Sequence, residues 1–267
     1  IFRVHETLPR LSTHNRQLRS AALERWAGDE ESGFEGLAHD RSTAPPGGGV
    51  DWSSFYAVRE SVAVRSSDDD DTDDDDDDDG SAYHAIVLRL AIAPPPDGAN
   101  FSVVEACPTE FEFEGTSKGF EGVASLRGAD DVLYLLGLCE GNHCAEGDRG
   151  KEPGNGRVVV MRREDIAGGG GCVWSTVTTI ALPRAAAFVD YSALAIHHST
   201  RAVAVSTQEG SQLWVGALSG GADGAFDPAT ARFTDGKVYD FARDDGCDPV
   251  YCNVEGIHWL EGGGEGT

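Results

Sequence analysis

Apolar residues in this chain occur in short runs that are separated by glycine, aspartate and proline, and many runs contain β-branched or aromatic side chains. This pattern predicts β-strands joined by turns and loops. Helical periodicity is weak, and a short helix is expected only at residues 17–27. The expected strands are residues 34–39, 54–60, 83–90, 102–113, 120–126, 132–140, 157–161, 173–183, 191–197, 202–209, 212–216 and 237–241.

A four-residue motif divides these strands into units. Phe34-Glu35-Gly36-Leu37 returns as Phe-Glu-Gly-Val at 120–123 and as Val-Glu-Gly-Ile at 254–257. A third unit begins at Tyr191, where serine and alanine replace the Glu-Gly pair. Four antiparallel strands per unit, repeated along the chain, are typical of a β-propeller. We therefore expect an all-β fold, a β-propeller of four-stranded antiparallel blades; unequal units with long loops favour it over a solenoid.

The units start further apart than the ~40–50 residues of a compact propeller blade. Insertions explain the excess, above all the aspartate-rich residues 66–81, which we expect to be disordered. Three blades and the start of a fourth are fewer than a closed propeller usually has, so we expect an incomplete fragment. The expected division is an N-terminal segment at 1–33, either a short helix or the end of a preceding blade, and a propeller domain at 34–267.

The chain has a formal net charge of −25. This balance argues against nucleic acid or an anionic membrane surface as a partner, because both bind lysine and arginine. No apolar run approaches the ~18 residues of a transmembrane helix. Charge and length leave the oligomeric state open.

The six cysteines suggest an oxidising compartment. Two C-x4-C motifs, at 139–144 and 247–252, each enclose a short polar loop suited to a local disulfide, and Cys107 and Cys172 remain as a third pair. The spacing is not the C-x2-C of a zinc site. Disulfides favour a secreted or extracytoplasmic protein; scattered free cysteines are the alternative.

The motif glutamates are the first candidate site. The first strand of each propeller blade lines the central channel, so Glu35, Glu121 and Glu255 would converge there. Carboxylates in one channel repel one another unless a cation such as Ca²⁺ neutralises them. We therefore consider these three residues as catalytic candidates. The alternative is a structural turn in which each carboxylate caps backbone N–H groups.

A second set of acids ends the second strand of each unit: Glu60, Glu140 and Glu209. Together with Asp190, beside the divergent third motif, they are candidate ligands for Ca²⁺ and its activated water. Ordinary solvation of strand ends is the alternative. The histidines share no repeat position, which indicates structural or exposed roles.

Several motifs resemble a known family. The Gly-Phe-Glu-Gly-Leu-Ala stretch at 33–38 and its counterpart at 119–124 resemble the opening of the phytase-like ("esterase-like activity of phytase") β-propeller family. Residues 133–140, 188–192, 206–209 and 251–256 are similar to later parts of that propeller. The resemblance implies a secreted propeller acting on phosphate or other esters, with the motif glutamates and second-strand glutamates as its acids. An anionic phosphate ester would need Ca²⁺ or basic side chains beside so acidic a channel.

The expected function is accordingly a secreted phytase-like propeller with Ca²⁺-assisted esterase or phosphoesterase activity on a small molecule. One alternative is a non-catalytic binding propeller that presents its loops to a protein or glycan. Another is a lactonase-like propeller that holds one Ca²⁺. The one G-x-S-x-G match, residues 115–119, lies between two expected strands and not between a strand and a helix, and the chain has no P-loop or H-E-x-x-H motif, which argues against an α/β-hydrolase serine mechanism.

Overall fold

The computed structural model describes residues 2–3, 16–17, 33–41, 51–64, 82–93, 101–115, 118–140, 144, 155–168, 171–221, 225–242 and 254–259. The described part of the chain is all-β; the one helical element that lies wholly within it is the 3₁₀ turn η4 (Arg184–Ala186), and Arg41 also has 3₁₀ conformation. Gln17, where we predicted the start of a helix, ends a strand instead; the rest of that prediction, the insertion at 66–81 and the cysteine pair at 247 and 252 lie outside these residues.

The strands follow the expected order. A short pair, β1 (Phe2–Arg3) and β2 (Arg16–Gln17), precedes three series of four strands. The series are β3 (Phe34–His39), β4 (Phe55–Val64), β5 (Ala82–Ile92) and β6 (Phe101–Phe113); β7 (Phe120–Arg127), β8 (Leu133–Cys139), β9 (Arg157–Asp165) and β10 (Cys172–Ala181); and β11 (Ala193–Ile196), β12 (Ala202–Thr207), β13 (Gln212–Ser219) and β14 (Arg232–Asp240).

The sheets differ from the prediction in one respect. Neighbours within each series pair antiparallel, but only the third series forms a separate four-stranded sheet. The first two series join into one eight-stranded sheet of order β3-β4-β5-β6-β10-β9-β8-β7. Separate four-stranded sheets are therefore the wrong description of the first two units. β6 and β10 are the last strands of these two series, and each has an edge that its own series leaves unpaired. The two edges pair in parallel through Thr109 and Trp174.

Two of the predicted disulfides are present. Cys107 on β6 is bonded to Cys172 on β10, which fastens the junction between the first two series, and Cys139 is bonded to Cys144. The first bond crosses between units and the second closes a short loop after β8. Both pairings confirm the sequence prediction.

The core lies between successive series. Along β8 and β9, alternate side chains point to opposite faces of the sheet. Leu135 and Val159 pack into a cluster shared with the first series, whereas Leu136 and Val160 pack into a cluster shared with the third. The second series is thus held between the other two by a core on each face.

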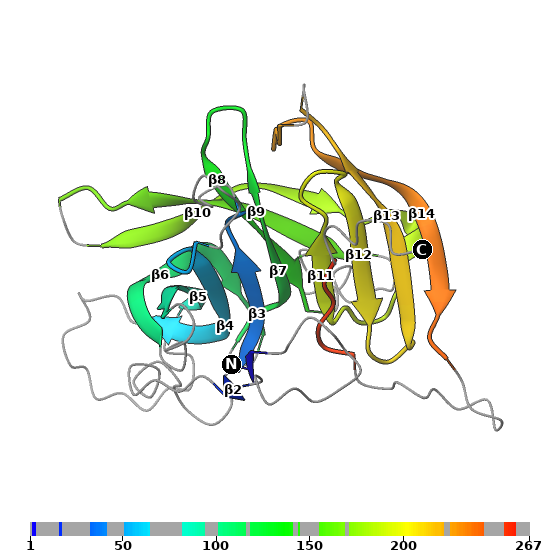
Figure 1. The fold of residues 1–267 in the computed structure, drawn as a ribbon, viewed down its shortest axis with the longest axis horizontal. Coiled ribbons are helices and arrows are strands. Elements are labelled where there is room, and N and C mark those ends of the chain that lie inside the picture. The colour runs from blue at the N-terminus through cyan, green and yellow to red at the C-terminus, as the bar shows by residue number, and fades with distance from the viewer. Residues whose placement is uncertain are drawn as a thin grey trace.

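The first strands of the series lie side by side. Figure 1 shows β7 between β3 and β11, with the C-terminal segment 254–259 next to β11. Two hydrogen bonds hold that segment: the Ser192 hydroxyl donates to the carbonyl of Val254 (2.7 Å), and the Trp259 indole donates to the carbonyl of Ala195 (3.2 Å). A contact of 3.1 Å between Arg41 Nη2 and His258 Nε2 connects the segment back to the end of β3.

Candidate functional site

A cavity of about 450 Å³ lies among the starts of these four segments. Its ionisable side chains among the described residues are the three motif glutamates, Glu35, Glu121 and Glu255. Apolar residues and the motif glycines complete its wall. The repeat therefore brings carboxyl groups from β3, β7 and segment 254–259 into one site, because equivalent positions of successive units face the same space.

The glycine of the motif permits this arrangement. A Cβ atom on Gly36 would lie 2.8 Å from Val123 Cγ1, and one on Gly122 would lie 2.5 Å from the backbone nitrogen of Leu194. Neighbouring first strands approach so closely that a larger residue would meet the backbone or a buried side chain of the next unit. The Glu-Gly pair combines a carboxylate with a position that must remain small.

The third series lacks the acid. Ser192 takes the place of glutamate and is buried, with its hydroxyl 3.1 Å from that of Ser206 and bonded to Val254. It therefore joins the third unit to segment 254–259 and contributes no charge. The cavity has three motif acids rather than four.

Burial changes the acidity of these groups. Desolvation, followed by the charges of Glu35, Glu140, Glu60 and Glu255 in that order, raises the pKa of Glu121 to about 8. Desolvation also raises the pKa of Glu35, with contributions from the same cluster. At neutral pH Glu121 therefore keeps its proton.

Two of the predicted second-strand acids belong to this cluster. The Glu60 carboxylate accepts a hydrogen bond from the Gly33 amide (2.7 Å), and Glu140 Oε1 pairs with Lys118 Nζ (3.2 Å). Glu140 Oε2 is buried and finds no hydrogen-bond partner among the described residues. The charges of both carboxylates raise the pKa of Glu121, but neither side chain lines the cavity wall.

Strand register assigns a different residue to the third unit. Gly36 pairs with Val58 and Gly122 with Leu138, and in the third series Ala193 pairs with Ser206. Two residues further on stand Glu60, Glu140 and Gln208, so Gln208, not Glu209, is the structural equivalent. Its amide donates to Glu255 Oε1 (3.4 Å), so it faces the motif acid of the next unit.

The remaining two predicted ligands lie elsewhere. Glu209 is exposed. Asp190 accepts hydrogen bonds from the hydroxyl of Thr207 and from the amides of Gln208 (2.8 Å) and Glu209 (3.0 Å). Its carboxylate therefore stabilises the turn after β12, and neither residue lines the cavity.

A carboxylate cavity has the donor chemistry that Ca²⁺ prefers. Three carboxylates bound directly to one Ca²⁺ would bring their oxygens within about 5 Å of one another. Among the described residues, the one trio of candidate ligand atoms within 4.8 Å is Glu105, Cys107 and Cys172, and the disulfide excludes it as a metal site. The motif glutamates thus fit a cation held by at most two of them, with water or substrate completing its shell.

A second, smaller cavity of about 80 Å³ follows along the same four segments. Leu37, Val123, Leu194 and Ile257, the last motif residue of each unit, line both cavities. These four apolar residues are thus shared by the walls of both cavities. The second cavity also contains His39, His198, His258 and Arg41. Sequence reasoning missed these histidines because they occupy different offsets from their motifs.

Comparison with known proteins adds no family. No family model matches the chain, and no curated protein matches it. Two solved structures of Sqt1 from Chaetomium thermophilum are similar over 78% of this chain at 10% identity, with TM-scores of 0.32 and 0.33. The chain spans 36% of the length of each. Similarity at this level carries no inference, and the molecule is best defined as an all-β protein with an acidic cavity between repeated units.

One further observation concerns membranes. Within the described residues, no helix has the length and apolar character needed to cross a bilayer.

The acidity of Glu121 predicts a pH dependence of stability. The folded protein holds this proton up to about pH 8, whereas a glutamate with the ordinary pKa of 4.5 loses it much earlier. The stabilising contribution is thus fully present below about pH 4.5 and is lost as the pH rises through about 8. Urea unfolding between pH 5 and 9 should show a decline that Glu121→Gln reduces. The exposed Glu112→Gln is the control, and an equal decline in all three proteins would contradict the shift.

Proposed function

We propose that this chain is part of a β-propeller whose first-strand cavity hydrolyses a small-molecule ester or phosphate ester with the help of Ca²⁺. The observation that carries the proposal is the single cavity lined by Glu35, Glu121 and Glu255, one from each of three units. Three series of antiparallel strands with their first strands side by side support the propeller arrangement. The two disulfides support a secreted or extracytoplasmic location.

The acid–base roles follow from the different environments of the carboxyl groups. Glu121, with a pKa of about 8, is protonated at neutral pH and would donate that proton to the leaving oxygen. Glu35 lines the same cavity, is less buried than Glu121, and would accept a proton from the attacking water. Pairs of acids whose environments separate their pKa values commonly divide such roles.

The cation would be held by at most two carboxylates of the cluster at once, Glu255 on the cavity wall and either Glu60 or Glu140 behind Glu121, with water or substrate completing its shell. The buried, unpartnered oxygen of Glu140 is consistent with this use. Bound Ca²⁺ would polarise the ester and offset the negative field of the cavity. Without such an ion, carboxylates at this density would repel a phosphate ester.

The test is turnover by the full-length protein. We would assay p-nitrophenyl acetate, p-nitrophenyl phosphate and a simple lactone, each with Ca²⁺ and with a chelator. We expect Ca²⁺-dependent turnover of at least one substrate and a drop in kcat/KM of about 100-fold or more in Glu121→Gln. Glu112→Gln, an exposed change on β6, should leave the rate unchanged. A folded protein that turns over none of these substrates would refute the hydrolase.

A binding propeller without catalysis is the second candidate. The spacing of the motif carboxylates favours it, because no trio among the described glutamates is close enough to enclose a bare ion. The cavity would then bind an organic or hydrated cation and release it unchanged. Calorimetric binding of Ca²⁺ in the absence of any turnover would identify this case.

A further inference from the structure

The second cavity differs in charge from the first cavity and from the chain as a whole. The protein carries a net charge of −25, and the neighbouring cavity contains three carboxyl groups. The described residues that line the second cavity include one guanidinium and three imidazoles but no acidic side chain. The Ser125 hydroxyl and the Trp259 indole add polar character. Such a site can stay basic inside a strongly acidic protein if the carboxylates near it are paired with other groups.

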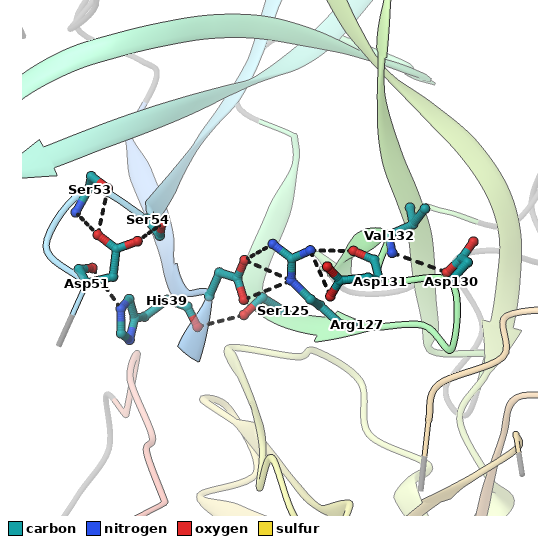
Figure 2. Close-up of polar contacts among 10 residues, drawn as sticks. His39, Asp51, Ser53, Ser54, Ser125, Arg127, Asp130, Asp131 and Val132 are labelled. Carbon is teal, nitrogen blue, oxygen red and sulfur yellow. Dashed lines mark hydrogen bonds and ion pairs between the residues drawn. The ribbon is translucent and has the colours of Figure 1, made fainter. Parts of the chain in front are cut away.

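The carboxylates of Asp40 and Asp51, whose charges act on His39, are engaged in other contacts. The carboxylate of Asp40 is 2% exposed and accepts hydrogen bonds from Arg127 Nε (3.1 Å) and Nη2 (2.6 Å). In Figure 2, Asp51 accepts from the amide of Ser53 (2.9 Å) and from the hydroxyl of Ser54 (2.7 Å). Arg127 thus neutralises the Asp40 charge, and the Asp51 carboxylate is hydrogen-bonded to residues that do not line the cavity.

The same contacts hold His39 in place. Its Nε2 lies 3.0 Å from the carbonyl of Asp51 and so carries a proton, while its own carbonyl accepts the Ser125 hydroxyl (2.8 Å), as Figure 2 shows. The ring also stacks on Phe55, with centroids 4.4 Å apart. The other ring nitrogen, Nδ1, is the atom that protonation would convert into a donor.

Arg41 and His258 form the second half of the site. Arginine only donates, so the 3.1 Å contact makes His258 Nε2 an acceptor and its ring neutral. Protonation of that ring would set two positive charges at hydrogen-bonding distance. An anion between them would remove the repulsion and accept a hydrogen bond from each.

We infer that the second cavity binds a small oxyanion such as phosphate or sulfate, held by Arg41 and the imidazoles of His39, His198 and His258. The size is suitable, since about 80 Å³ accommodates several waters but no large ligand. A transition metal is a poorer occupant. The three histidines form no close ligand trio among the described residues, and a guanidinium would repel the ion. The inference does not depend on catalysis in the first cavity.

Binding should strengthen as the histidines gain protons. Burial lowers the pKa of His39 and the Arg41 charge lowers it further, whereas the Asp51 contact and the Asp40 and Asp51 charges oppose this. His198 and His258 face the same space from the third and fourth segments, and Arg127 cancels Asp40. Protonated imidazoles attract an oxyanion more strongly than neutral ones do. We therefore expect the oxyanion to bind best at the lower pH, where more of the imidazoles are protonated.

Calorimetric titration of the full-length protein with sulfate tests the site, because sulfate stays doubly charged between pH 6 and 8. We expect one saturable site at pH 6, weakened about 10-fold or more at pH 8 and in Arg41→Gln. Phosphate and glycerol 3-phosphate serve as further probes: tight phosphate with weak glycerol phosphate indicates a free ion, and equal binding indicates the oxyanion group of a larger molecule.

Matched variants separate this site from the rest of the protein. Arg232→Gln, an exposed change on β14, and Glu121→Gln in the first cavity should both bind sulfate like the unchanged protein. If Arg41→Gln unfolds, His258→Gln replaces it, with thermal unfolding as the check on folding. Absence of saturable binding at pH 6, or equal binding by folded Arg41→Gln, would overturn the proposal.

Discussion

Replacing Cys107 and Cys172 together by alanine should lower the free energy of unfolding by about 4 kcal/mol. The disulfide spans a sequence separation of 65 residues, and the entropy that such a cross-link removes from the unfolded chain amounts to about 4 kcal/mol at 25 °C. Both sulfur atoms are in the core beside Trp174, so alanine would also leave space there. Urea unfolding under oxidising conditions measures the loss.

The second disulfide provides a matched control. Cys139 and Cys144 are separated by 5 residues, for which the same chain entropy gives about 2 kcal/mol. The double alanine change at this pair should therefore cost about half as much. A larger loss at the short loop than at the β6–β10 junction would show that the junction is not what holds the first two series together.

Gly122→Ala should destabilise the protein by about 3 kcal/mol. The new Cβ would lie 2.5 Å from the nitrogen of Leu194 and 3.2 Å from the carbonyl carbon of Ala193. Backbone atoms cannot rotate away as a side chain can, so β7 and β11 would have to separate. Overpacking of this kind commonly costs about 1–3 kcal/mol, and a backbone clash lies at the upper end.

Gly256→Ala is the control within the same motif. A Cβ at this position would meet no described atom within 4 Å, so the change should alter the free energy of unfolding by less than about 0.5 kcal/mol. Chemical denaturation of both variants distinguishes the two sites. Equal losses would mean that the motif glycines serve the turn conformation rather than the approach of neighbouring strands.

Much of the local structure could be read from the sequence. β3 has the bounds that its apolar pattern predicts, Phe34–His39, because alternation and punctuation by polar residues are local signals. Cys107 and Cys172 could be paired by elimination once the two short loops were assigned. The junction of β6 with β10 could not be predicted, since pairing between two sheet edges leaves no periodic trace in either strand.

The site shows the same division. Repetition of the motif was enough to expect Glu35, Glu121 and Glu255 in one place. Choosing the acid that ends each second strand selected Glu209, whereas hydrogen-bond register places Gln208 beside Glu255. One residue more or fewer in a turn changes which residue ends the strand in the sequence, but it leaves the pairing of residues between strands unchanged. Only the pairing in the sheet therefore identifies the equivalent position.

By itself the sequence determined the strands, their repeat and the acid placed at the start of three units, because these depend on neighbours along the chain. The tertiary structure decided which groups face each other. It gives an acidic and a basic cavity four apolar wall residues in common and raises the pKa of Glu121 to about 8. Both results depend on burial and on charges from distant segments, and these arise only when the first strands of all four units lie together.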